Sequence, residues 1–159
     1  MLSLTALTAL VGLVLLVWSP SLLAQTEPRG LLLGDVKIES PGAAVPARVA
    51  NFSGIWDGVW SGAATSRGYQ PKKGGREVTI AIEKIEPPRV TAVYAWGAYE
   101  DRKGGWRRLT GGISGDHLVL EWGEDSVIQI ILKPTGNPRL IEAAFVAEKY
   151  TMTATLKKR

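Results

Sequence analysis

Apolar and polar residues alternate along the chain after residue 51, and turn-forming residues interrupt the alternation about every ten positions. A period of two places every second side chain on one face of a β-strand, whereas a helix needs apolar residues at spacings of three and four. No stretch after residue 51 keeps the helical spacing for three turns. The sequence therefore predicts one all-β domain over residues 51–159.

Eight strands are expected in this domain, separated by Gly, Pro, Asn and Asp residues that favour turns. They cover residues 52–60, 78–86, 90–96, 106–113, 118–122, 127–133, 139–146 and 150–156. Because most connections are short, the strands favour an antiparallel meander, and eight strands close into a small barrel without exposed edges. We predict a single eight-stranded antiparallel up-and-down barrel. The rival arrangement, a β-sandwich, usually needs longer crossing connections.

The first 24 residues carry no charged side chain, and their apolar run is broken at Pro20 before Ala24. This order is typical of a secretory signal peptide, so residues 1–24 are expected to be cleaved after Ala24, with no stable membrane insertion afterwards. The alternative is an uncleaved anchor, because the uncharged run nearly spans a bilayer. Residues 25–50 mix Pro, Gly, Ala and charged residues without a period, which predicts a flexible leader or an arm that inserts into a partner.

The chain has no cysteine and one histidine, His117. These counts exclude disulfide scaffolds, zinc fingers, thiol nucleophiles and sites built from several imidazoles. An exported domain without disulfides fits a bacterial protein, so we expect a periplasmic or secreted location.

Motifs for catalysis and for phosphate or calcium binding are missing from the sequence. We therefore expect a protein that is not an enzyme and that holds no metal and no cofactor. The net charge of +4 is modest for a nucleic-acid-binding protein, and export also argues against that partner.

The two ends of the expected barrel differ. Loops after odd-numbered strands share one end, and two of them, residues 61–76 and 97–105, are the longest in the domain. Long loops with a basic excess, carried on a rigid scaffold, indicate an open mouth that attracts an anionic head group. Inward-facing aromatic rings would line a cavity there, or would simply fill the barrel. The candidate ligand contacts are Trp60, Tyr69, Trp96, Tyr99 and Trp122 among aromatic residues, and Arg67, Arg76, Arg102 and Lys103 among basic ones.

A short motif, Gly54-Ile55-Trp56, lies near the start of the first expected strand, and a basic run occupies residues 157–159. This layout resembles the G-x-W signature of the lipocalins and the wider calycin group. The resemblance covers residues 52–159 in layout. It implies that Gly54 and Trp56 form the closed base of the barrel, with a basic residue of the last strand covering the tryptophan.

The sequence as a whole predicts a non-catalytic exported barrel that binds a small apolar or amphiphilic ligand, including an anionic one, at its open end. Two alternatives remain. One is a protein-interaction module, such as a periplasmic protease inhibitor, whose leader over residues 25–50 reaches into its partner. The other is a glycan-binding module that stacks sugar rings on Trp60, Trp96 and Tyr99.

Overall fold

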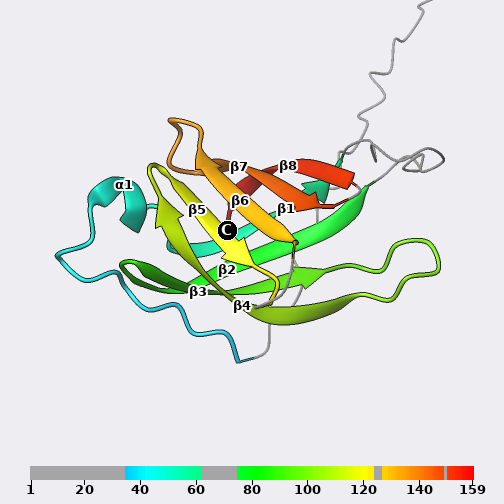
Figure 1. Ribbon diagram of the computed structural model, residues 1–159, viewed down its shortest axis with the longest axis horizontal. Coiled ribbons are helices and arrows are strands. Elements are labelled where there is room, and N and C mark those ends of the chain that lie inside the picture. The colour runs from blue at the N-terminus through cyan, green and yellow to red at the C-terminus, as the bar shows by residue number, and fades with distance from the viewer. Residues whose placement is uncertain (1–34, 62–74, 124–126, 149) are drawn as a thin grey trace, which may run out of the picture.

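The computed structural model describes residues 35–61, 75–123, 127–148 and 150–159. Eight strands each pair antiparallel with their neighbours in sequence, and β1 pairs with β8, so the sheet closes on itself (Figure 1). The predicted all-β, eight-stranded up-and-down barrel is confirmed. The strands are β1 (Gly54–Trp60), β2 (Arg76–Glu86), β3 (Arg89–Trp96), β4 (Gly105–Ser114), β5 (His117–Glu121), β6 (Gln129–Pro134), β7 (Leu140–Ala147) and β8 (Tyr150–Lys158).

The first strand begins later than the sequence pattern indicates. A single helical turn, α1 (Ala47–Ala50), precedes it, and the Phe52 N–H donates to the Val49 carbonyl over 3.1 Å. Phe52 therefore belongs to the turn after α1, and β1 starts at Gly54. Across the described ranges no helix is long and apolar enough to cross a bilayer.

The residues just before β1 belong to the packed domain. Val49 and Phe52 are 4% and 3% exposed, and both join the hydrophobic core together with Trp56. Residues on both sides of residue 51 therefore pack with the barrel, and α1 covers one end of it. The predicted signal peptide (1–24) and residues 25–34 of the predicted leader lie outside the described residues.

Further upstream, the chain is attached to the outside of the barrel at a β-bulge. The β2–β3 register shifts between Ile82 and Lys84, which leaves the Glu83 carbonyl free of the ladder, and the Glu39 N–H donates to it over 2.7 Å. The Glu83 carboxylate accepts two bonds from the Arg108 guanidinium, at 2.7 and 2.9 Å. The segment from residue 35 to α1 is thereby held against β2.

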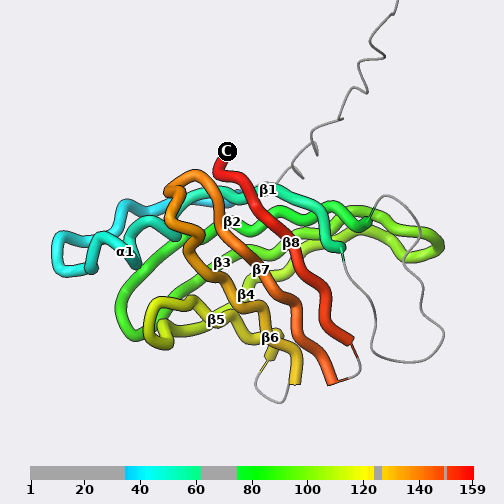
Figure 2. Tube along the Cα trace, turned by 90° about the horizontal axis from the view of Figure 1, so that it is seen from above, coloured from blue at the N-terminus to red at the C-terminus, as the bar shows by residue number. Residues whose placement is uncertain are grey.

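The two ends of the barrel differ, as Figures 1 and 2 both show. The turns after β2, β4 and β6 gather with α1 at one end, which we call the closed end, and His117 starts β5 there. The β3–β4 hairpin projects from the opposite, open end. This arrangement follows from up-and-down connectivity, which sends alternate connections to opposite ends.

Candidate functional site

Among the residues that the structure describes, six aromatic side chains point into the barrel in the half toward its open end. Cross-strand partners lie on the same face of a sheet, so the register fixes their direction: Trp60 pairs with Arg76, and Ile130 with Phe145. Together they form the aromatic cluster, which comprises Trp60, Tyr94, Trp96, Trp122, Phe145 and Tyr150.

The aromatic cluster has a buried lower layer. Trp60, Tyr94 and Phe145 are 2%, 3% and 5% exposed. The Trp60 Nε1–H donates to the Tyr94 hydroxyl over 2.9 Å, and the Trp60 and Phe145 ring centroids lie 6.0 Å apart, edge to face. These rings fill the interior as core residues, so Trp60 is not at the surface where a contact residue was expected.

An upper layer of the cluster is half-buried. Trp96 stacks on Tyr94 with 5.4 Å between centroids, and the Trp96 and Trp122 centroids are 5.5 Å apart. Both indoles come from strand ends, Trp96 at the end of β3 and Trp122 just after β5. They present the accessible part of the aromatic surface at the open end.

Burial raises the pKa of Tyr94 to about 12. Between about pH 10 and 12 the folded protein keeps the Tyr94 proton, whereas the unfolded chain has released it. The free energy of unfolding therefore falls as the pH rises through this range, by about 2–3 kcal/mol in all. Tyr94→Phe has no proton to lose and should flatten this decline. Urea unfolding of both proteins at pH 9 and pH 11 measures the difference, and equal declines would contradict the assigned burial effect.

Two arginines of the described strands also point inward at the open end. Arg76 lies opposite Trp60, and Arg107 lies opposite Tyr94, so both share the interior face of their strands. The Arg76 guanidinium carbon is 5.8 Å from the centroid of Trp96, and that of Arg107 is 5.3 Å from the centroid of Trp122. Both separations fall within the range of cation–π contact.

The two arginines differ in their polar bonds. Arg76 donates to the Gly97 carbonyl over 2.8 Å and to the Lys103 carbonyl over 2.9 Å, which ties it to the base of the β3–β4 hairpin. Arg107 is exposed and rests on Trp122. Arg76 therefore supports the hairpin, while Arg107 presents its guanidinium toward solvent.

The remaining expected contact residues are spread along the hairpin or lie outside the described residues. Tyr99 and Arg102 exchange backbone hydrogen bonds of 2.9 and 3.0 Å, and Arg102 and Lys103 are exposed near the hairpin tip. Arg67 and Tyr69 lie outside the described residues. Of the nine expected contacts, the structure thus brings together Trp96, Trp122 and Arg76 above Trp60.

Arg107 and Phe145 were not among the expected contacts. The alternation of Ile141, Ala143 and Phe145 along β7 already places Phe145 on an apolar face. Arg107 pairs with the inward-facing Tyr94 across β3 and β4, so it shares the interior face. The sequence alone does not fix that strand register. Within the described part of the chain, no three His, Cys, Asp or Glu side chains gather where they could hold a metal.

The closed end is built around Trp56, which is 1% exposed. Its Nε1–H donates to the Phe52 carbonyl over 2.7 Å, and the Lys158 Nζ lies 5.1 Å from its ring centroid. Burial lowers the pKa of Lys158. Gly54 has φ = 121°, and a Cβ there would lie 2.8 Å from the Lys158 Cε, so glycine lets the lysine cover the indole.

Comparison with known proteins adds no family to this picture. The closed eight-stranded antiparallel barrel has the layout of the lipocalins, with a tryptophan and a lysine at its closed end. No protein-family model matches the chain, and no curated protein matches it either.

Proposed function

We propose that this chain is an exported, non-catalytic, lipocalin-like barrel that binds a small amphiphilic anion at its open end. The observation that carries the proposal is the pair of inward-facing arginines, Arg76 and Arg107, each above a tryptophan of the aromatic cluster. Arg107 is exposed at the rim of the open end, so its guanidinium is accessible from solvent to an anionic head group, while the indole beneath it offers apolar surface.

The chemistry of the two layers indicates how such a ligand lies. A planar guanidinium can stack on an indole and still offer two parallel N–H donors to a carboxylate. Arg107 is the anchor for the acidic head, since Arg76 already donates to two carbonyls of the hairpin. Trp96 and Trp122 offer half-buried rings to the apolar part of the ligand.

The buried lower layer limits the depth of binding. Because Trp60, Tyr94 and Phe145 pack against one another, the ligand rests on the upper layer and does not enter the barrel. A shallow seat of this kind suits a single ring or one end of an acyl chain.

Export rests on the sequence pattern of residues 1–24, which supports a periplasmic or secreted location after cleavage at Ala24. The inserting-arm alternative has less support over residues 35–50, because Glu39 bonds to Glu83 and Val49 packs in the core of the same chain. A ligand-binding role is therefore the better supported reading.

A fluorescent fatty-acid analogue, 11-(dansylamino)undecanoic acid, tests the proposal. We expect saturable binding to the wild type, and Arg107→Gln should weaken it about tenfold, since losing a charged hydrogen bond at a solvent-facing site costs about 1.4 kcal/mol. The uncharged methyl ester should bind both proteins equally weakly. Titration followed by dansyl fluorescence measures both constants.

The matched control is Arg89→Gln, which removes an exposed arginine at the closed end and should leave binding of the acid unchanged. The proposal fails if the wild type shows no saturable binding of the acid, or if Arg107→Gln and Arg89→Gln weaken it to the same extent.

A further inference from the structure

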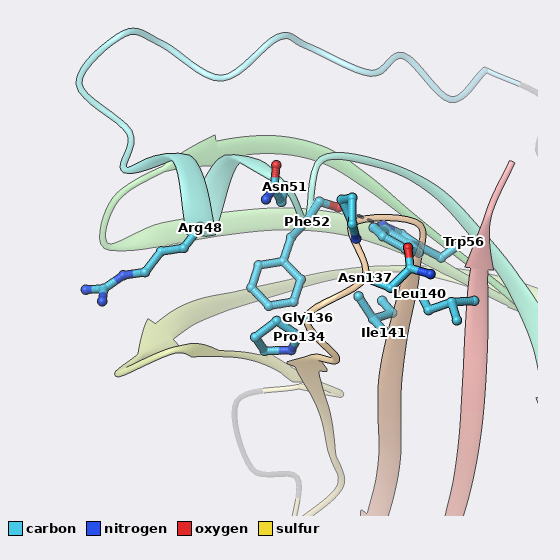
Figure 3. Close-up of a pocket in the computed structure, with 10 residues that line it drawn as sticks. Arg48, Asn51, Phe52, Trp56, Pro134, Gly136, Asn137, Leu140 and Ile141 are labelled. Atoms are coloured by element: carbon cyan, nitrogen blue, oxygen red, sulfur yellow. Dashed lines mark hydrogen bonds between the residues drawn. The ribbon is translucent and has the colours of Figure 1, made fainter.

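A cleft of about 250 Å3 opens at the closed end, at the far end of the barrel from the arginines discussed above. It lies between the α1 turn and the turn that joins β6 to β7 (Figure 3). Its apolar walls come from Phe52, Trp56, Leu140 and Ile141. Three of these belong to the hydrophobic core, so the walls are rigid, and the cleft is a fixed feature of the closed end.

The polar groups around the cleft favour a negative ligand. Of the described residues that line the cleft, Arg48 is the one charged residue, and none carries a carboxylate. Asn51 and Asn137 add side-chain amides, and the Asn137 Oδ1 accepts the Arg139 N–H over 2.9 Å, which leaves its NH2 group as the part able to meet a ligand. Lys158, whose Nζ donates to the Asn51 carbonyl over 3.2 Å, adds a second positive charge beside the cleft.

The size and chemistry of the cleft together define a ligand class. We propose that this cleft is a second binding site, which takes a small carboxylate carrying one apolar ring. Its volume equals that of about eight water molecules, which leaves room for a ligand the size of benzoate. The ring would lie against Phe52 and Leu140, and the carboxylate would meet Asn137 and Arg48.

The Arg48 side chain points away from the cleft in the structure. Figure 3 shows its guanidinium directed away from the other lining residues, and the side chain is exposed. Rotation of an exposed side chain between staggered conformers costs little, so the arginine can turn toward a bound anion. We therefore expect a contribution from its charge that is smaller than that of a preorganised arginine.

Two indole N–H groups provide reporters at opposite ends of the barrel. The Trp56 indole lines the cleft, whereas the Trp60 indole bonds to Tyr94 beneath the open end. In 1H–15N spectra of the full chain, benzoate should shift the Trp56 indole resonance saturably, with a Kd on the order of 1 mM for so small a ligand. A shift of the Trp60 resonance reports binding at the open end instead, so the two resonances distinguish the two sites.

Charge dependence is tested with matched ligands and variants. Neutral benzamide and cationic benzylamine should bind the wild type at least about threefold more weakly than benzoate, because the described lining residues include a cation and no carboxylate. Arg48→Gln should weaken benzoate about threefold without changing benzamide, and Arg89→Gln, an exposed arginine outside the lining, should change neither.

The outcomes separate this site from the open end. Absence of a saturable Trp56 shift overturns the second site, as does equal binding of benzoate and benzylamine. A shift confined to the Trp60, Trp96 and Trp122 resonances also overturns it, while supporting the function proposed for the open end. Failure of the dansyl fatty acid to bind, with benzoate still shifting Trp56, leaves the closed-end site standing alone.

Discussion

Replacing Gly111 by alanine should destabilise the barrel by about 3 kcal/mol, the upper part of the range for overpacking. Gly111 lies on the inward face of β4, opposite Val90 on one side and Leu120 on the other. A Cβ at Gly111 would lie 2.8 Å from the Leu120 Cα and closer still to the Val119 carbonyl oxygen. Both are backbone atoms, so relief requires β4 and β5 to separate. Urea unfolding followed by tryptophan fluorescence measures the loss.

The neighbouring glycine provides the control. Gly112 faces outward, and the nearest atom to a Cβ there is the Pro88 carbonyl oxygen at 3.2 Å. Gly112→Ala should therefore change stability by less than about 0.5 kcal/mol, as most surface substitutions do. Similar losses of stability in the two variants would show that the close approach of β4 and β5 at Gly111 is not what destabilises Gly111→Ala.

Trp56→Ala should cost about 3–5 kcal/mol, the usual range for removing a large buried aromatic side chain. The indole is 1% exposed, packs with Phe52 and Val49, and loses both its hydrogen bond to the Phe52 carbonyl and its contact with Lys158. Since small domains are stable by about 5–15 kcal/mol, the variant should unfold at a far lower urea concentration than the wild type.

An exposed tryptophan serves as the comparison. Trp106 stands on the outward face of β4 and is 64% exposed. Trp106→Ala removes the same atoms from a solvated position and should shift the free energy of unfolding by no more than about 0.5 kcal/mol. If Trp56→Ala proves equally mild, the closed end contributes little to holding the barrel together.

Strand order and closure were predictable from the sequence because alternation is a local property. Val78, Ile80 and Ile82 are apolar at every second position, and in the structure all three face the barrel core from β2. The bulge at Glu83 breaks this parity by one residue, and its cause is not local. The bulge is stabilised by Arg108 and Glu39, which come from β4 and from the segment before α1.

The candidate site was predictable only in part, for a similar reason. Trp96 and Trp122 stand out as large rings at strand ends beside loops, and the structure brings them together. Whether Trp60 lines a cavity or fills the core depends on Phe145 and Tyr94, which approach it from across the barrel. Such contacts depend on the register and curvature of the closed sheet, which composition and periodicity do not specify.

The pairing of β1 with β8 makes the order of strand neighbours circular, although the chain itself is linear. The Arg159 N–H donates to the Ile55 carbonyl over 2.9 Å, and the Lys158 ammonium bonds to the Asn51 carbonyl, so the two ends of the strand sequence lie side by side. A short linker between them, with a new opening at the exposed Gly115 turn, would preserve every strand neighbour. A circularly permuted chain should therefore fold into the same barrel, with the open end and the closed end still on opposite sides of it.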